Sequence, residues 1–568
     1  MLLILISWLY IFSTATVWGI AFNNLFKLKD NNYLITQILG LFSITIFTAI
    51  SCFFTSINIG FYSVFILTSI VLAYFTKKQL KLYLTQVKIR FFSLNKYLQI
   101  TFSIFGFLCL AQASTAPYII DNESYYLQTI KWLNEYGFVK GLSNLHLFFA
   151  QTSGWHILQS ALNFSFLTNQ LNDLSAYIYC LVAFYSFEKI NLIFKENSTQ
   201  IAHFFIAIIP LVSILFFQFI SAPSPDIPVF LFSFLLFYIL LKKWNQLSVI
   251  DFKNITFICF FILLIKISSV YIVCIPIILL AINYQKFKNS LGTLLGVGLL
   301  VLAIFIGKNQ WITGYPLFPL QNFKWLTTDY SLPEVYQAFF FKTNKVYAYK
   351  ISYLEYQELS VLQRLQVWLS LPKLHGIFNK LIVVLIIVFP FFILLKKKYY
   401  QPLLAIYFLA CVQLVVLFMT SPQYRFFLVF ILTLGALLLF VIFQKKILIK
   451  IALPTSLILT CLILFFPFKL DNFTTNKFTQ NNSSFKFSYI LFPHQNSKFN
   501  YLYQKEKIGN LEYNNPYNQE FFWITGDGEL PVVKKEQLEY FKNKYHYYPQ
   551  LRTGDLKDGF YSKSIDND

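Results

Sequence analysis

Two carboxylates, Asp121 and Glu123, open a polar segment that interrupts an otherwise apolar sequence. They follow a long apolar run, at the point where a membrane-spanning helix would end. A carboxylate at the mouth of a membrane span loses hydration, so it usually serves a function or faces a wet cavity. This position and chemistry suggest an enzyme that works at a membrane surface on a lipid-linked substrate. The alternative is an interfacial helix whose first turn carries acids because they suit the helix dipole.

A third carboxylate, Asp226, lies in the turn SAPSPDIP at residues 221–228, which contains three prolines. Proline fixes its own φ and keeps the preceding residue out of a helix, so this turn is stiff. Asp226 therefore either caps the helix that follows or lines the same cavity as Asp121.

Three cations stand where apolar runs begin or end, namely Lys266, Lys308 and Arg425. Arginine binds a phosphate as a bidentate fork, and lysine binds it as a point charge. These side chains are therefore candidates for holding a phosphate or pyrophosphate. Their alternative role is to snorkel, with the stem in lipid and the charge at the interface.

Aromatic and histidine side chains accompany these charges. Tyr315 lies in the loop KNQWITGYPLFP at residues 308–319, which is either a stacking surface for a sugar ring or an isoprenoid, or part of an aromatic belt. His146 and His156 flank the loop after Asp121, and either could assist acid–base chemistry. A histidine whose hydrogen bonds are satisfied at the interface is the alternative. No P-loop, dinucleotide-binding glycine pattern or HExxH motif occurs, and no metal site is predicted.

The elements that must position these residues are membrane-spanning helices. Of 568 residues, 57% are hydrophobic and 12% are charged, and the mean hydropathy is +0.57. The apolar runs are continuous rather than alternating, which favours helices over a β-barrel. The sequence predicts an all-α polytopic membrane protein with roughly 12–14 transmembrane helices. The predicted spans are 2–22, 33–54, 58–75, 99–117, 173–194, 201–220, 226–241, 252–265, 268–283, 290–308, 379–395, 401–420, 425–443 and 449–467.

Clusters of lysine and arginine orient these spans. The segment 76–97 carries six basic residues and no acidic residue, so the positive-inside rule predicts a cytoplasmic loop. Counting outward places the other lysine clusters on the same side and the polar motifs on the extracytoplasmic side. Loop charges thus explain the net charge of +21 without nucleic-acid binding. The other clusters are Lys242/Lys243, Lys286/Lys288, Lys396/Lys397/Lys398 and Lys445/Lys446.

These spans divide the chain into a transmembrane part, residues 1–467, and a C-terminal extracytoplasmic region, residues 468–568. Two large external loops are predicted, at 118–172 and 309–378. Residues 121–136 have helical periodicity, with an apolar side that would lie in the plane of the membrane interface. Turn and strand signals in the C-terminal region predict a small α+β unit.

The order of these motifs resembles a bacterial group of polytopic membrane proteins found in Bacteroidetes and spirochaetes. More broadly, it resembles the GT-C superfamily of integral-membrane glycosyltransferases. The resemblance to the bacterial group covers most of the membrane part. It rests on Asp121, Lys131–Trp132, Asn134–Gly137, Gly141–Leu142, Asn144–His146, Ser221–Pro228, Lys266–Ser268, Thr313–Pro319 and Pro422–Phe426.

GT-C enzymes use polyprenyl-linked sugar donors and carry a catalytic acid in the first large external loop. The resemblance implies that Asp121 is the general base that deprotonates the acceptor hydroxyl. It implies a supporting role for Glu123, although Asp-Asn-Glu is not the commonest acidic pair of the superfamily. Lys266, Lys308 and Arg425 would stabilise charge on the departing lipid phosphate, and the transfer would invert the sugar. Some members bind a divalent metal and others do not.

The resemblance thus implies a glycosyltransferase of the bacterial inner membrane that assembles a cell-surface glycan on a glycan, lipid or protein acceptor. Asp226, Tyr315, His146 and His156 would complete its substrate site. The alternatives are a flippase for lipid-linked oligosaccharides, another transporter, or a polysaccharide polymerase. A transporter should carry polar residues at mid-depth and broken helices in both halves, whereas polar groups here collect on one face. A polymerase should carry external arginines, yet the loop 309–378 contains only Arg364.

Overall fold

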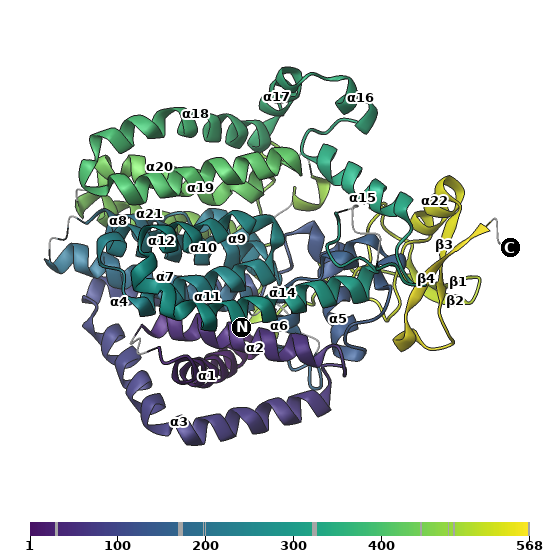
Figure 1. Ribbon diagram of the computed structural model, residues 1–568, viewed down its shortest axis with the longest axis horizontal. Helices are drawn as coiled ribbons and strands as arrows, with labels where there is room; N and C mark the ends of the chain where they lie inside the picture. The colour runs from purple at the N-terminus through teal and green to yellow at the C-terminus, as the bar shows by residue number, and fades with distance from the viewer. Residues whose placement is uncertain are drawn as a thin grey trace.

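The fold is a bundle of apolar helices with a small strand-containing region packed on one end (Figure 1). The computed structural model describes residues 1–568 except 29–31, 169–173, 197, 199, 321–325, 444–445, 475, 481–482 and 566–568.

Nine helices of the described chain are long and apolar enough to cross a membrane. A tenth results if α8 (Ile201–Leu211) and α9 (Ser213–Ile220), which are bent by 55°, form one span. A helix satisfies its backbone hydrogen bonds internally, as lipid requires. The prediction of an all-α polytopic membrane protein is confirmed in this coarser form. The nine contain α1 (Leu2–Leu25), α2 (Tyr33–Ser51), α3 (Ile59–Ser93), α7 (Leu174–Glu196), α10 (Asp226–Lys243), α14 (Leu291–Thr313), α18 (Lys373–Leu395), α19 (Tyr400–Met419) and α21 (Lys446–Phe465).

Other predicted spans also form helices. The predicted pair at 252–283 is α11 (Val249–Ile265) followed by the 3₁₀ segment η5 (Ile267–Val273) and α12 (Cys274–Ile282). Lys266 separates them, and its extended backbone (φ −154°) ends α11. The chain therefore turns back at Lys266, and α12 packs against α11. The remaining helices are α4 (Lys96–Ala113), α13 (Tyr284–Phe287), α15 (Glu334–Tyr347), α16 (Tyr353–Glu358), α17 (Val361–Leu369) and α20 (Tyr424–Phe443).

The segment 76–97, predicted as a loop, is mostly helical. The helix α3 continues through it to Ser93 and contains 35 residues. At about 1.5 Å per residue, this length exceeds the hydrocarbon thickness of a bilayer, about 30 Å. Lysine, glutamine and leucine are good helix formers, so the charged residues extend the helix instead of ending it. Figure 1 shows α3 along the lower edge of the bundle, turning up toward α4.

The described lysine clusters lie together at one end of the bundle, which we call the basic end. Trp244, just after α10, donates its indole N–H to Gln401 Oε1 of α19 at 2.8 Å. Lys446 Nζ, at the start of α21, donates to the carbonyl of Phe194 near the end of α7 at 3.0 Å. Neighbouring helices thus run in opposite directions, as the predicted topology requires. Lys445 lies outside the described residues.

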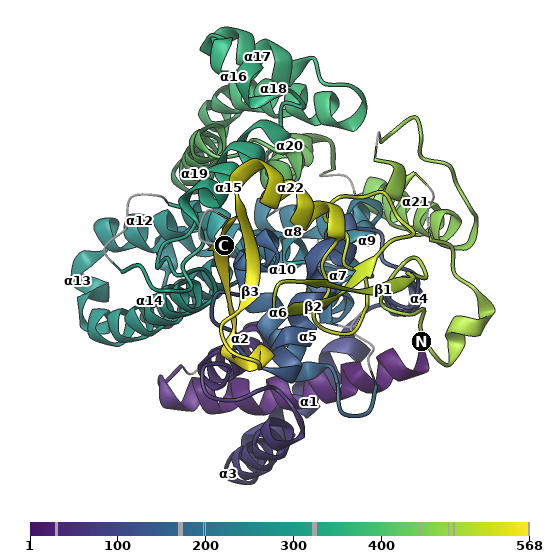
Figure 2. The same cartoon turned by 90° about the vertical axis from the view of Figure 1, so that its right-hand side faces the viewer.

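The C-terminal region packs on the opposite end, which we call the polar end (Figure 2). Its described residues form two antiparallel strand pairs and one α-helix, which confirms a small strand-containing C-terminal region. The pairs are β1 (Tyr503–Ile508) with β2 (Leu511–Pro516) and β3 (Tyr547–Leu551) with β4 (Phe560–Ser564), and the helix is α22 (Lys535–Tyr545).

The segment after Asp121 is buried between the bundle and this region. It forms a π-helix, η1 (Asn122–Tyr126), which continues as α5 (Leu127–Glu135), and later α6 (Gly154–Leu162). The apolar side of α5, expected at the membrane interface, is enclosed by protein instead, and Trp132 is 1% exposed. The ring of Phe560 lies 5.7 Å from that of Trp132, so β4 covers the surface that lipid would otherwise meet.

Candidate active site

Asp121 and Arg425, which are 304 residues apart, form an ion pair at the polar end. Arg425 Nη1 donates to Asp121 Oδ2 at 2.6 Å. Asp121 immediately precedes η1, and Arg425 is the second residue of α20. Their side chains are 20% and 28% exposed, so a ligand can reach both partners.

Asp226 and Lys266 form a second ion pair nearby. Asp226 is the first residue of α10, where the helix dipole favours a carboxylate. Lys266 Nζ, from the turn between α11 and η5, donates to Asp226 Oδ1. Asp226 is 2% exposed, and its Oδ2 has no hydrogen-bond partner among the described residues. A buried acceptor without a donor is costly, which makes this oxygen a candidate to bind a ligand hydroxyl.

Phe426 and Tyr126 join the two ion pairs into one site. Lys266 Nζ and the Arg425 guanidinium lie 4.3 and 5.0 Å from the centre of the Phe426 ring. The Tyr126 hydroxyl lies 3.5 Å from Asp121 Oδ2. Burial, Tyr125 and the charges of Asp121 and Asp226 raise the pKa of Tyr126, whereas the charge of Arg425 lowers it. We call the four residues Asp121, Asp226, Lys266 and Arg425 the charged cluster.

His156 and Lys308 lie behind Tyr126. The His156 ring is 4.7 Å from the Tyr126 ring, and its Nδ1 accepts from the Ser153 amide in the capping box of α6. Burial and the positive charge of Lys308 lower the pKa of His156 to about 3. Lys308 is 8% exposed and donates to the Thr152 carbonyl. His156 therefore packs against Tyr126, and buried Lys308 binds the segment that precedes α6.

His146 and Tyr315 are engaged in other contacts. His146 Nδ1 accepts from the Phe148 amide at 3.3 Å, and its Nε2 lies 3.4 Å from the Trp523 carbonyl. Burial lowers the pKa of His146 to about 4. Tyr315 is 3% exposed and donates its hydroxyl to the Leu332 carbonyl at 2.9 Å. Both side chains pack inside the protein, so Tyr315 does not present a ring face for stacking.

Glu123 is fully buried where the C-terminal region covers η1. Its Oε1 accepts from Asn122 Nδ2 and from the Lys498 amide, each at 3.0 Å. Burial raises the pKa of Glu123, and these hydrogen bonds oppose the rise. The structure thus separates Glu123, which contacts the C-terminal region, from Asp121, which contacts Arg425.

The π-helix η1 depends on donors from the C-terminal region. The amide of Leu127 donates to Asn122, five residues back, instead of to Glu123 as in an α-helix. The Glu123 carbonyl accepts instead from the amides of Thr525 and Gly526 at 2.9 and 2.8 Å, and from Thr525 Oγ1 at 3.0 Å. Such π-turns are rare and occur often at functional sites. The loop at Thr525 and Gly526 thus completes the turn that follows Asp121.

Four further side chains near the charged cluster were not predicted as site residues. Tyr125 donates its hydroxyl to Gln151 Oε1 at 3.2 Å. Burial raises the pKa of Tyr347. The charge of Arg425 lowers this pKa, and the charge of Asp121 raises it. Tyr125 and Tyr424 could have been found because they are close in sequence to Asp121 and Arg425. Gln151 and Tyr347 have no such signal. The four are Tyr125, Gln151, Tyr347 and Tyr424.

Among the described residues, no three or more His, Cys, Asp or Glu side chains lie together in a group that could hold a metal ion. Residues 1–432 match a family model described as a domain of unknown function, DUF8201. This range includes all four residues of the charged cluster and leaves the C-terminal region outside. No curated protein and no solved structure matches the chain.

Proposed function

The chain belongs to the DUF8201 family, and we propose that it is a GT-C-type membrane glycosyltransferase of the bacterial inner membrane. It would move a sugar from a polyprenyl phosphate or pyrophosphate to a glycan, lipid or protein acceptor in cell-surface glycan assembly. The charged cluster carries this proposal. It combines a reachable carboxylate with two cations at the end of apolar helices. A carboxylate can activate a hydroxyl, and cations can stabilise a departing phosphate.

In the proposed reaction, the donor phosphate binds Arg425 and Lys266. Arg425 donates to Asp121 Oδ2, so an incoming phosphate would compete for the guanidinium and free this oxygen. The freed carboxylate accepts the proton of the acceptor hydroxyl as its oxygen attacks the anomeric carbon. The bond from that carbon to the phosphate oxygen breaks, and both cations stabilise the charge that develops on the phosphate. Attack opposite the leaving group inverts the sugar.

The remaining predicted residues support this geometry. Asp226 Oδ2, which has no donor among the described residues, would orient a sugar or acceptor hydroxyl. Glu123 would hold η1 against the C-terminal region, His156 would support Tyr126, and Lys308 would hold the segment at Thr152. The polar end would face away from the cytoplasm, because the lysine clusters occupy the opposite end.

A transporter of lipid-linked oligosaccharides is the second candidate. The bend of 55° between α8 and α9 favours it, because transporters place broken helices at their substrate sites. A transporter would bind the same lipid phosphate through the cations of the charged cluster. It would have no need of Asp121 as a base, so one carboxylate separates the two functions.

The decisive experiment replaces Asp121 in a strain that lacks the native gene. Lipid-linked sugars and surface glycans are profiled after complementation with wild type, Asp121→Asn or Asp329→Asn. We expect Asp121→Asn to lower transfer by about 10²–10⁴-fold and to leave the donor lipid unconsumed. Asp329→Asn is the matched control, because exposed Asp329 pairs with Arg552 at 2.6 Å at the same end. Full restoration by Asp121→Asn at normal membrane levels would contradict the enzyme and favour the transporter.

A further inference from the structure

A second group of charged side chains lies at the basic end, between α3, α7, α8 and α10. We call Arg90, Glu188, Lys189, His203 and Lys242 the basic-end cluster. Arg90 Nη1 donates to Glu188 Oε1 at 3.2 Å, and the Tyr33 hydroxyl donates to Glu188 Oε2 at 3.2 Å. The proposed glycosyl transfer uses none of these residues.

Positive charge exceeds negative charge in this cluster. Lys189 is 8% exposed. It interacts electrostatically with Glu188, Lys242 and Arg90. Lys189 Nζ lies 4.3 Å from the centre of the Tyr185 ring. Glu188 is the one carboxylate of this cluster, and it already pairs with Arg90. The cluster therefore has no second carboxylate to balance the charges of Lys189 and Lys242. Lys189 is buried, so its charge is costly unless a counter-ion binds.

His203 adds a hydrogen-bonding atom that lacks a partner. It is 5% exposed, and its Nδ1 lies 2.8 Å from Ser198 Oγ. Its Nε2 has no hydrogen-bond partner in the described part of the chain, and the charges of Lys242 and Lys189 act on this ring. When the Ser198 hydroxyl donates to Nδ1, the imidazole proton is on Nε2, which can then donate to an anion.

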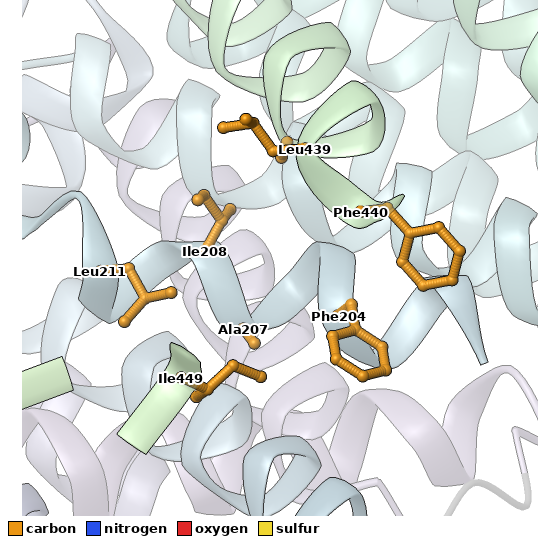
Figure 3. Close-up of a pocket in the computed structure, with 8 residues that line it drawn as sticks. Phe204, Ala207, Ile208, Leu211, Leu439, Phe440 and Ile449 are labelled. Atoms are coloured by element: carbon orange, nitrogen blue, oxygen red, sulfur yellow. The ribbon is translucent and has the colours of Figure 1, made fainter. Parts of the chain in front are cut away.

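A small apolar pocket lies between α8, α20 and α21 (Figure 3). Phe204 and Ala207 of α8, Phe440 of α20 and Ile449 of α21 line it. Its volume is about 10 Å³, roughly the space that one water needs, so it does not hold an acyl chain. The basic-end cluster lies near the ends of apolar helices, at the depth where lipid headgroups lie. A lipid that binds there would therefore keep its acyl chains in the bilayer.

We propose that the basic-end cluster binds the phosphate of an anionic lipid headgroup. The phosphate would accept hydrogen bonds from Lys189, Lys242 and His203, and the acyl chains would stay in the bilayer. Free phosphate offers the same chemistry, and the position of the cluster at headgroup depth favours the lipid as its source. This site is independent of the proposed glycosyl transfer.

The test measures the melting temperature of the purified full chain in a neutral detergent. The probes are phosphatidylglycerol, phosphatidylcholine and inorganic phosphate, each titrated separately. A ligand that binds only the folded protein raises the melting temperature by an amount that grows with the logarithm of its concentration divided by its Kd. The variants are Lys242→Gln, Lys189→Gln and Lys189→Arg. Lys397→Gln is the matched control, because Lys397 is an exposed lysine at the same end.

We expect phosphatidylglycerol, and not phosphatidylcholine, to stabilise the wild type and the control. Lys242→Gln and Lys189→Gln should each weaken this binding by about tenfold, the loss of one charge-assisted hydrogen bond. Lys189→Arg should retain it. If inorganic phosphate raises the melting temperature and neither lipid does, and if the variants weaken this effect in the same way, the site binds phosphate as a free ion. Equal stabilisation by both lipids, or an undiminished shift in Lys242→Gln, would overturn the proposal. Lys242→Gln keeps the test valid if Lys189→Gln fails to fold, because Lys242 is exposed.

Discussion

The ion pair between Asp121 and Arg425 holds the proposed base beside the cation that would bind the donor phosphate. Both side chains are partly exposed, and such pairs contribute only about 0–1 kcal/mol to stability. A phosphate can therefore displace the carboxylate from the guanidinium at little cost. An arginine would perform this exchange better than a lysine, because its planar fork binds two phosphate oxygens at once. The pairing thus explains how one residue could both restrain the base and release it when the donor binds.

The pair between Asp226 and Lys266 should show coupled stability. Lys266→Gln leaves the 2%-exposed Asp226 carboxylate without its cation, so the free energy of unfolding should fall by about 3 kcal/mol. Adding Asp226→Asn removes the uncompensated charge and should restore most of that loss. Transfer should stay low in both variants, because neither retains the cation for the phosphate. Thermal unfolding and glycan profiling of the two variants measure these effects.

Lys243 provides the matched control for this pair. Its ammonium lies 2.6 Å from Asp251, and its side chain is 44% exposed. Lys243→Gln should therefore cost less than about 1 kcal/mol and leave transfer unchanged. A double variant of Asp226 and Lys266 that is less stable than Lys266→Gln would contradict the coupling.

At the scale of elements, η1 determines where Asp121 lies. Helical periodicity over residues 121–136 predicts a helix, and the structure has one. The periodicity cannot reveal the π-turn, because the donor that completes it, Thr525, is 402 residues away from Glu123. For the same reason, the sequence identifies Asp121 and Arg425 as candidates but does not predict that they pair. Each was found from its position at the end of an apolar run, and no sequence pattern relates the two.

The hydroxyl of Thr525 should be required for transfer. Thr525 Oγ1 donates to the carbonyls of Glu123 and Ser124 at 3.0 and 2.9 Å. Thr525→Val keeps the shape of the side chain and the two backbone amides on the Glu123 carbonyl, but it removes the hydroxyl that donates to the buried Ser124 carbonyl, which costs about 1–3 kcal/mol. We expect transfer to fall at least about tenfold as Asp121 loses its position. Glycan profiling measures transfer, and thermal unfolding shows whether the fold survives.

Thr525→Ser separates the hydrogen bonds from the shape of this residue. It keeps the hydroxyl, so transfer should return to near the wild-type level. Thr553→Val is the control, because exposed Thr553 donates to Asp558 in the same region without contacting η1. Equal transfer by Thr525→Val and wild type would show that η1 holds its geometry without this hydroxyl.

At the scale of the whole molecule, the two ends of the bundle have different chemistry. Apolar length and lysine position predict the helices and their alternating direction, because both depend on local composition. The packing of the C-terminal region was not predictable in this way. Residues such as Trp132 present the same apolar periodicity whether lipid or β4 covers them. The family match ends at residue 432, yet the region beyond it completes η1. The C-terminal region is therefore a structural part of the candidate site.

The buried histidines of the polar end should make the protein sensitive to acid. The pKa of His146 is lowered to about 4 by burial, and that of His156 to about 3 by burial and by Lys308. An unfolded histidine has a pKa of about 6.5, so below this pH the unfolded chain binds protons that the folded chain excludes. The free energy of unfolding should therefore be undiminished above about pH 6.5. Below it, each histidine should lower that free energy by about 1.4 kcal/mol per pH unit.

Melting temperatures in detergent at pH 7.5 and pH 5 measure this acid sensitivity. The melting temperature of the wild type should fall on acidification, and His156→Gln should reduce the size of the fall, because glutamine binds no proton. The exposed His546 provides the control, and His546→Gln should melt like the wild type at both values. If His156→Gln loses as much stability between the two values as the wild type does, the protons must bind elsewhere. That outcome would contradict the inference that His156 is neutral in the folded protein.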